Sequence, residues 1–367
     1  MSVMIHIDGQ PAEHFPDYQK TLATLGPLPD ESRHLCEIWT TPPRREPSPH
    51  AVWLNPESSA AAQDWLHRGG AVLTTQLESS HAEPGSSVDH LRQRDSVIRA
   101  RCASAAPPDA PQLAAFLRHD FPLVDALMLA RAYRNQGWPY DLHHYPVPLD
   151  GPACASSFPA FPRHAGLYAV VPTSEWVRRL AQLHIPVVQL RDKQPDAASR
   201  SAAIAQAVQA ASGSGTLLFI NDDWQSAIQH HAYGVHLGQE DIDHADLAAI
   251  QRAGLRLGIS THGIYEMLRA HACRPSYLAI GAIYATATKS MPSLPQGLRR
   301  LQHYVRLASP HYPLVAIGGI DHSRIAGIWA AGVDSAAVLR AIVDAPDYRQ
   351  AAAELLATTP PIAIGAV

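Results

Sequence analysis

The residues best suited to chemistry follow short apolar runs of the chain. The run 186–190 leads into an amide and two cations at alternate positions, Gln189, Arg191 and Lys193. Alternate residues of an extended segment share one face, so these side chains can converge on an anion such as a diphosphate. A solvated charged loop is the competing interpretation of an isolated Arg-Asp-Lys sequence.

Carboxylates follow the next two apolar runs. Asn221 and Asp222 come directly after the run 216–220, and Asp241 follows the run 233–237. Two carboxylates from neighbouring segments can share a Mg²⁺ ion with the phosphate oxygens of a substrate. Capping of the next helix is the competing interpretation of Asp222 or Asp223.

Three further clusters suit phosphate or carboxylate groups. Ser260 ends the run 255–260, where its hydroxyl can donate to phosphate or cap a helix. Thr286, Thr288 and Lys289 lie in a long loop, and Gly319 belongs to a glycine pair before a helical stretch. Glycine lets backbone N–H groups approach an anion closely. Each cluster is a weak indication alone, but their succession along the chain predicts an anion-binding site.

The elements that must position these clusters are short strands. After residue 163, Val/Ile/Leu-rich runs alternate with Ala-rich amphipathic stretches. The runs cover 166–171, 186–190, 216–220, 233–237, 255–260, 277–282, 314–318 and 335–339. Continuous apolar runs suit strands buried on both faces, and this alternation predicts a small (β/α)₈ (TIM) barrel with its chemistry at the carboxyl ends of the strands. A doubly wound open sheet is the alternative, and the first connection, 173–184, looks trimmed.

The chain before the barrel is irregular and rich in proline. Strands are expected at 51–54 and 71–75, and helices at 58–68 and within 111–133 with a break near Pro122. We therefore expect a smaller α/β domain over residues 1–145, a Pro-rich linker over 146–163 and the barrel over 164–367.

Composition excludes several classes of protein. The net charge is −4 without a dense Lys/Arg block, which argues against a nucleic-acid-binding surface. Neither a signal peptide nor an apolar stretch long enough to span a membrane can be read, so we expect a cytoplasmic protein acting on small molecules. The scattered cysteines indicate no disulfide framework. The sequence is compatible with a homo-oligomer.

Taken together, the motifs resemble those of thiamine-phosphate synthases, over residues 164 to about 356. The matching sequences are QLRDK (189–193), FIND (219–222), GVHLGQED (234–241), STH (260–262), TATK (286–289) and AIGGI (316–320). The resemblance implies a (β/α)₈ barrel that joins hydroxymethylpyrimidine diphosphate to a thiazole phosphate, usually its carboxylate form, and releases diphosphate. Electron release from the ring amine would help diphosphate to leave, so the enzyme would neutralise charge and exclude water instead of supplying a nucleophile.

The same resemblance implies roles for individual residues. Asp222 and Asp241 would hold Mg²⁺ on the diphosphate. The pyrimidine diphosphate would be surrounded by Gln189, Arg191, Lys193, Asn221, Ser260 and Lys289, of which Arg191, Lys193, Ser260 and Lys289 would be catalytic. The thiazole phosphate would be placed by Thr286, Thr288 and the backbone at Gly319, Val338 and Leu339.

The sequence departs from the family pattern at two positions. Arg340 stands where serine is common, and Ala285 replaces a proline. A thiazole tautomerase-like or non-catalytic regulatory homologue is the alternative function, with His262 as an acid or base in the tautomerase.

The first half faintly resembles the C-terminal part of a hydroxymethylpyrimidine phosphate kinase. The Gly-x-Gly anion loop of that kinase is missing, and residues 105–109 stand there instead. This absence favours an inactive remnant or an unrelated structural domain over a bifunctional kinase–synthase.

Overall fold

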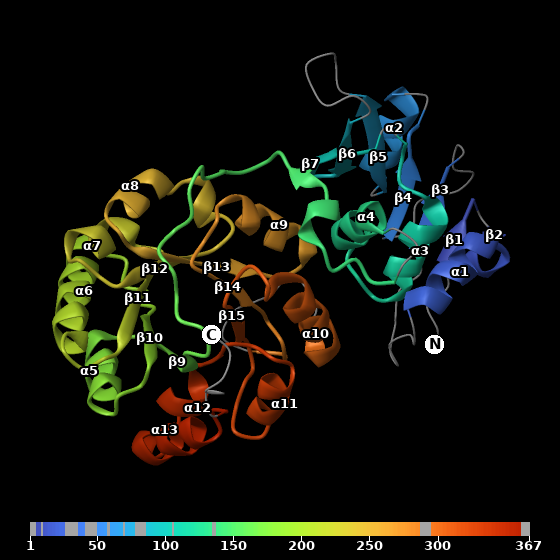
Figure 1. Ribbon diagram of the computed structural model, residues 1–367. Helices are drawn as coiled ribbons and strands as arrows, with labels where there is room; N and C mark the ends of the chain where they lie inside the picture. The colour runs from blue at the N-terminus through green and yellow to red at the C-terminus, as the bar shows by residue number, and fades with distance from the viewer. Residues whose placement is uncertain are drawn as a thin grey trace. The chain divides into compact units, whose positions relative to one another are not determined.

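The structure is a computed structural model of the chain, and two compact units make it up. They are Met1–Gly151 and Pro152–Val367 (Figure 1). The described residues are 5–8, 10–25, 36–40, 50–56, 59–68, 70–77, 86–104, 106–133, 137–286 and 295–360.

The second unit is a closed barrel of parallel strands. Its strands are β9 (Gly166–Val171), β10 (Val187–Leu190), β11 (Leu217–Asn221), β12 (Gly234–Leu237), β13 (Arg256–Thr261), β14 (Tyr277–Ile280), β15 (Leu314–Ile317) and β16 (Ser335–Val338). Each strand pairs with the next in sequence, and β16 closes the ring by pairing with β9, with Ser335 opposite Gly166. The expected (β/α)₈ barrel is therefore confirmed, and the open sheet is wrong.

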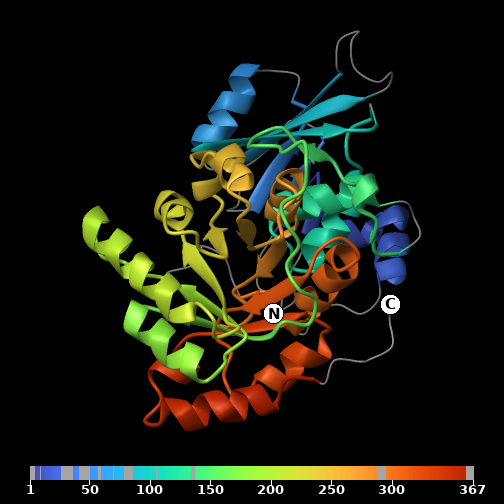
Figure 2. The same ribbon diagram turned by 60° about the vertical axis from the view of Figure 1, so that its left-hand side comes forward.

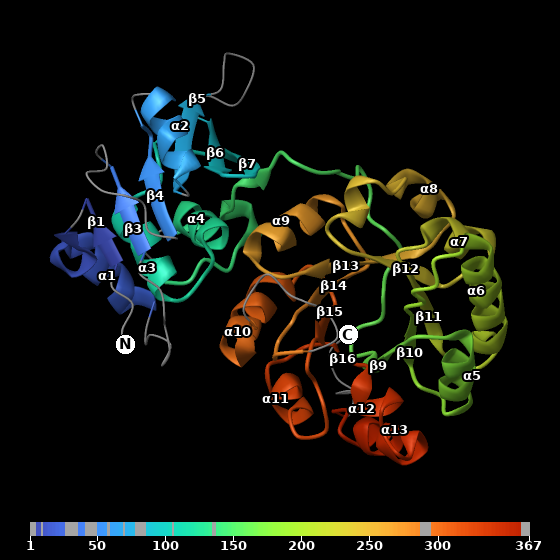
Figure 3. The same ribbon diagram turned by 180° about the vertical axis from the view of Figure 1, so that it is seen from behind.

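Helices surround the barrel strands, as Figures 2 and 3 show. They are α5 (Ser174–Gln182), α6 (Ala197–Ala211), α7 (Trp224–Gln229), α8 (Leu247–Arg252), α9 (Ile264–Ala272), α10 (Gly297–Ala308), α11 (Ile325–Ala330), α12 (Arg340–Val343) and α13 (Tyr348–Ala357). The first connection is not trimmed to a loop, because α5 occupies it and Thr173 caps this helix by accepting a hydrogen bond from the Trp176 N–H.

Aromatic rings fill the interior of the barrel. Phe161, Tyr168, Phe219 and Tyr277 all belong to the buried core. The ring centroids of Phe161 and Tyr277 are 4.8 Å apart, and those of Phe219 and Tyr277 are 5.2 Å apart. Close packing of large rings holds Tyr277 in one position near the barrel axis.

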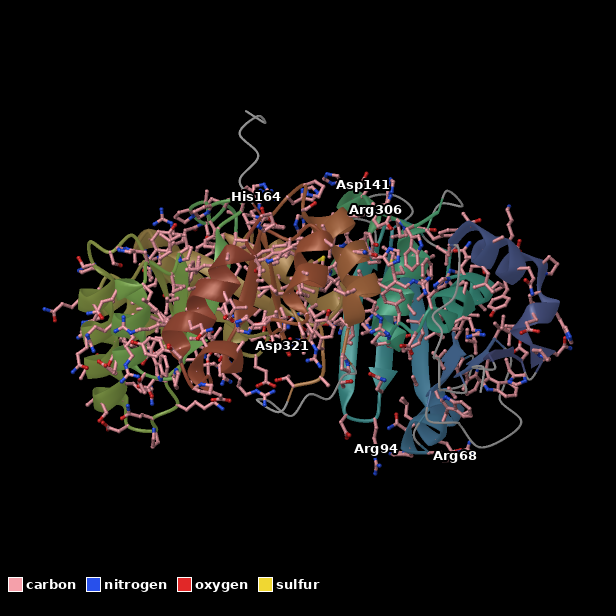
Figure 4. All side chains as sticks on the ribbon, turned by 90° about the horizontal axis from the view of Figure 1, so that it is seen from below. Arg68, Arg94, Asp141, His164, Arg306 and Asp321 are labelled. Atoms are coloured by element: carbon pink, nitrogen blue, oxygen red, sulfur yellow. The ribbon has the colours of Figure 1, made fainter. Side chains whose placement is uncertain are left out.

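The two ends of the barrel are distinguishable in Figure 4. His164 lies just before β9, at the end where the strands begin, and its backbone N–H donates to Asp334 at 3.1 Å. Asp321 lies after β15, at the end where the strands finish. The polar clusters predicted from sequence belong to this second end.

The Pro-rich stretch 146–163 is hydrogen-bonded along its length. Val147–Pro148 forms strand β8 beside β7 (Ser96–Cys102), and the Leu149 N–H donates to the Arg99 carbonyl at 3.0 Å. Residues from 152 onward belong to the barrel unit, where the Phe158 N–H donates to the Arg274 carbonyl at 3.0 Å.

The first unit is a mixed α/β fold built on one sheet. Its strand order is β2-β1-β3-β4-β5-β6-β7-β8, parallel from β1 to β5 and antiparallel from β5 to β8. Besides β7 and β8, the strands are β1 (Ile5–Ile7), β2 (Gln10–Pro11), β3 (Cys36–Trp39), β4 (His50–Leu54), β5 (Ala71–Leu77) and β6 (Ser87–Gln93). The helices are α1 (Pro16–Leu25), α2 (Ser59–His67), α3 (Ala110–Arg118) and α4 (Leu123–Ala132). Sequence analysis predicted β4, β5, α2 and the pair α3–α4, but it missed α1 and the strands β1, β2, β3, β6, β7 and β8.

A buried ion pair joins the sheet of the first unit to α4. Asp89 on β6 accepts from Arg131 Nε at 2.6 Å, and the side chains are 1% and 5% exposed. Thr75 donates to the same carboxylate at 2.8 Å, so the charges are satisfied on several sides. Arg94, at the turn of the β6–β7 hairpin, marks the solvent-facing end of these strands in Figure 4.

Candidate active site

Neighbouring strand ends bring the first three predicted clusters to one rim of the barrel. Strands β10, β11 and β12 are adjacent, and each ends just before or within a cluster. The Arg191 N–H donates to the Val171 carbonyl at 2.8 Å, which fixes Arg191 one residue beyond β10. Lys193 is exposed in the loop that follows.

Asp222 and Asp241 face each other across this rim. The Asp222 N–H donates to the His236 carbonyl at 3.0 Å, and the residue adopts φ = 62°, a left-handed conformation that aspartate tolerates. Asp241 accepts from the Gly238 N–H at 3.0 Å. The two carboxyl groups are in hydrogen-bond contact, and the Asn221 amide also contacts Asp222.

Capping explains the neighbouring carboxylate and leaves Asp222 for another role. Asp223 is the N-cap of α7, since its Oδ1 accepts from the Ser226 N–H at 3.0 Å. Asp222 makes no such cap. Of the two interpretations that the sequence left open, helix capping therefore applies to Asp223.

The environment of Asp222 raises the pKa of its carboxyl group to about 6. Dehydration by surrounding protein atoms is the largest cause, and the negative charge of Asp241 is the second. Arg191 and the Asn221 amide oppose the shift. Two carboxylates that repel each other at a solvent-accessible rim form a pair that a divalent cation would stabilise.

The donor set fits a cation that takes most of its ligands from substrate and water. The described residues contain no cluster of three or more histidine, cysteine or acidic side chains suited to a metal. Two carboxylates from Asp222 and Asp241 agree with the Mg²⁺ preference for few protein ligands plus phosphate oxygens.

We expect the stability of the metal-free protein to fall as pH rises from about 4 to above 6. The pKa of Asp222 is higher in the folded protein, about 6, than its ordinary value of 3.8. In this window the folded state therefore binds more protons than the unfolded state, and ionisation disfavours folding. Melting temperatures in EDTA across this range measure the effect. Asp241→Asn is expected to flatten the profile, and an unchanged profile in this variant would contradict the assigned repulsion.

Gln189 and Ser260 are connected through the barrel interior by residues that sequence analysis did not single out. Gln189 Nε2 donates to the Tyr168 hydroxyl at 2.9 Å, and this hydroxyl lies 2.8 Å from that of Tyr277. His236 joins the Tyr277 hydroxyl to the Ser260 hydroxyl, at 2.7 Å and 2.8 Å respectively. Side chains alternate along β12, so His236 faces into the barrel while the buried Val235 and Leu237 face away from it. This alternation is the signal in the sequence that could have pointed to His236.

The glycine pair after β15 forms a close turn. Gly318 and Gly319 have φ values of 104° and 65°. A Cβ atom on Gly319 would lie 2.7 Å from the Ala285 carbonyl oxygen, so only glycine fits. Arg324 Nη1 donates to the Gly319 carbonyl at 2.8 Å and its guanidinium lies over the Tyr284 ring.

The remaining predicted site residues have different positions. Val338 ends β16 and is buried, Leu339 is half-buried, and Arg340 begins α12 as an exposed residue. Thr286 is half-buried after β14, whereas Thr288 and Lys289 lie outside the described residues. His262 is hydrogen-bonded through Nδ1 to Glu266 at 2.7 Å.

The fold and its rim define the class of protein. The closed (β/α)₈ barrel carries cationic, acidic and hydroxyl side chains at the carboxyl ends of its strands. Enzymes with the TIM-barrel fold have their active sites at this end, and the chain has the features of that class.

Comparisons with known proteins identify the family within this class. The family model described as thiamine monophosphate synthase matches residues 167–342. A thiamine-phosphate synthase of Serratia proteamaculans is 52% identical over 199 residues, which cover 54% of this chain and 93% of the relative. One from Pectobacterium atrosepticum is 50% identical over 191 residues, covering 52% of this chain and 90% of the relative. A solved thiamine phosphate pyrophosphorylase from Pyrococcus furiosus is 28% identical with a TM-score of 0.48, covering 54% of this chain and 96% of the other.

The chain belongs to the thiamine-phosphate synthase family, and it is an enzyme of thiamine biosynthesis. The predicted family resemblance of the barrel is therefore confirmed, and membership is consistent with a metal-assisted reaction on small molecules. In the part of the chain that the structure describes, no helix has the length and apolar character needed to cross a bilayer.

Proposed function

We propose that the barrel condenses hydroxymethylpyrimidine diphosphate with thiazole phosphate, or its carboxylate, to give thiamine phosphate and diphosphate. The observation that carries this proposal is the Asp222–Asp241 pair beside Arg191 at one rim of the barrel. This site can receive a diphosphate together with a cation. A tautomerase would have no evident need for two paired carboxylates.

Asp222 and Asp241 would hold Mg²⁺, which supplies charge neutralisation to the departing diphosphate when bound. Arg191, Lys193 and Lys289 would add positive charge around the same group. Asn221 would orient Asp222, because its amide already contacts that carboxyl group.

The chain's own residues would lower the barrier by electrostatics and positioning. Loss of diphosphate leaves positive charge on the pyrimidine methylene carbon, which the thiazole nitrogen then captures. Gln189 and Ser260 would hold the pyrimidine diphosphate, while Thr286, Thr288 and the backbone at Gly319, Val338 and Leu339 would place the thiazole phosphate. Preorganised charge in a site shielded from water makes such a step faster.

We further propose that residues 164–367 contain all of this machinery, with residues 1–145 as a separate domain and 146–163 between them. None of the residues assigned a role here lies in the first unit, Met1–Gly151. An inactive kinase remnant or an unrelated structural domain remains our hypothesis for the first domain.

Release of diphosphate tests the proposal. Purified protein, Mg²⁺ and hydroxymethylpyrimidine diphosphate are mixed with and without thiazole phosphate, and diphosphate is quantified. We expect rapid release only with both substrates, since the thiazole captures the reactive species. Absence of release from folded protein with both substrates and Mg²⁺ would refute the proposed reaction.

Arg191→Ala is expected to lower kcat/KM about 10²-fold, the usual loss on removal of one preorganised charge or donor. Steady-state kinetics with varied pyrimidine diphosphate measure the effect. Arg179→Ala is the matched control, because Arg179 is an arginine of α5 that pairs with Glu175 on the outer surface. Equal activity of the two variants would remove Arg191 from the site.

A further inference from the structure

A continuous hydrogen-bond chain crosses the interior of the barrel. It runs from Gln189 through Tyr168, Tyr277 and His236 to Ser260, with successive distances of 2.9, 2.8, 2.7 and 2.8 Å. The first four residues are 4%, 1%, 0% and 6% exposed. The five residues come from five different strands, and the chain of bonds ends at the rim that carries the proposed site.

The chemistry of the donors gives this chain a direction. Gln189 Nε2 is a donor only, so the Tyr168 oxygen accepts from it. A buried O–H without an acceptor is costly, and of the two described partners of the Tyr168 hydroxyl only the Tyr277 oxygen can accept its proton, so Tyr168 donates to Tyr277. The Tyr277 proton is then directed to Nδ1 of His236. A neutral imidazole with an accepting Nδ1 carries its proton on Nε2, which donates to the Ser260 oxygen.

The same contacts leave His236 neutral. A protonated imidazole donates from both nitrogens, whereas Nδ1 of His236 accepts from the Tyr277 hydroxyl, so the ring holds one proton, and that proton lies on Nε2. Ser260 accepts that proton in a hydrogen bond, and its own O–H remains to donate elsewhere.

Packing is arranged to keep Tyr277 in this chain. Gly258 on β13 has no side chain where a Cβ atom would lie 2.1 Å from Tyr277 Cζ and 2.3 Å from its hydroxyl oxygen. Phe161 and Phe219 pack against the same ring from other directions. The space left by the glycine and the packing of the two phenylalanine rings therefore hold the Tyr277 hydroxyl in the position where it links Tyr168 to His236.

We propose that Tyr168, Tyr277 and His236 form a positioning network that fixes the Nε2–H tautomer of His236 and presents the Ser260 hydroxyl to the substrate as a hydrogen-bond donor. The substrate atom that meets Ser260 is then an acceptor. This inference rests on the proposed function for the identity of the substrate, the pyrimidine diphosphate, but the tautomer itself does not depend on it.

Nitrogen-15 NMR of the full-length protein tests the tautomer without any substrate. The His236 signal is assigned by its loss in His236→Gln. We expect the Nε2–H tautomer at neutral pH, and a shift toward mixed tautomers in Tyr277→Phe because Nδ1 loses its donor. An Nδ1–H tautomer or an imidazolium in the unmodified protein would overturn the network, whatever the activity of the enzyme.

A double-mutant cycle tests whether the network acts through Ser260. We expect Tyr277→Phe to lower kcat/KM about ten-fold, the loss of one useful hydrogen bond. In a Ser260→Ala background the same change should have an effect below about two-fold, since coupled residues are not additive. Two fully additive effects would overturn the positioning role.

A matched control uses another tyrosine–histidine bond, which is slightly longer than the 2.7 Å bond between Tyr277 and His236. The Tyr312 hydroxyl lies 2.8 Å from His271 Nδ1, and Tyr312 precedes β15 at the opposite end of the barrel. Tyr312→Phe is expected to leave kcat/KM within about two-fold, as distant sites behave independently. Tyr168→Phe breaks the network one bond earlier and replaces Tyr277→Phe if that variant does not fold.

Discussion

Asp222→Ala is expected to lower kcat/KM about 10³-fold while leaving the fold intact. The carboxylate contacts Asp241 and lies at an exposed rim position, so its removal takes away charge from the proposed cation site without opening the core. Loss of one preorganised electrostatic interaction costs about 10²–10³ in rate, and loss of the cation places the effect at the upper end. Steady-state kinetics over a range of Mg²⁺ concentrations measure it.

The adjacent carboxylate supplies the control. Asp223→Asn keeps an oxygen that can accept from the Ser226 N–H and cap α7. We expect this variant to retain activity within about three-fold, because capping is worth about 1 kcal/mol of stability and does not involve the substrate. Similar losses in Asp222→Ala and Asp223→Asn would contradict the assignment of the two roles.

Asp89→Ala is expected to lower the local free energy of unfolding of the first unit by about 3–5 kcal/mol, the range for breaking a buried ion pair from one side. The Arg131 side chain, 5% exposed, would lose the carboxylate that accepts from its Nε. Native-state hydrogen exchange of β6 and α4 in the full chain measures the effect.

An exposed pair in the same unit is the control for this variant. Asp64 lies on α2 and Arg68 lies one residue beyond the end of this helix; their side chains pair at 2.6 Å and are 64% and 38% exposed. Asp64→Ala should change stability by no more than about 1 kcal/mol, because exposed ion pairs contribute little. A loss below about 1 kcal/mol in Asp89→Ala as well would show that the buried pair is not stabilising.

The barrel could be predicted from the sequence because its strands are buried on both faces. Runs such as Gly166–Val171 are apolar throughout, and every residue of that strand is buried. Periodicity alone did not exclude the open sheet, because closure depends on the pairing of β16 with β9, which are far apart in sequence.

The first unit was harder to predict, and strand β6 shows why, because it carries polar residues on its buried face. On β6 the buried positions are Ser87, Asp89 and Leu91. Asp89 is accommodated only because Arg131, 42 residues later, neutralises it. A pattern of apolar and polar residues cannot reveal such a partner.

In the candidate site as well, residues at the ends of neighbouring strands could be predicted from sequence, whereas contacts between residues far apart in sequence could not. Motifs at the strand ends predicted Asp222 and Asp241, since consecutive parallel strands place their ends together. The interior chain behind Ser260 escaped prediction, because Tyr168 and Tyr277 are 109 residues apart and their contact arises only in the closed barrel.

Formation of thiamine phosphate is the most direct test of the central claim. The purified chain is incubated with hydroxymethylpyrimidine diphosphate, thiazole phosphate carboxylate and Mg²⁺, and the product is oxidised to its fluorescent thiochrome form. We predict product that depends on both substrates and disappears when EDTA is added. Folded protein that gives no product under these conditions would contradict the proposed reaction, and product that persists in EDTA would contradict the metal role of Asp222 and Asp241.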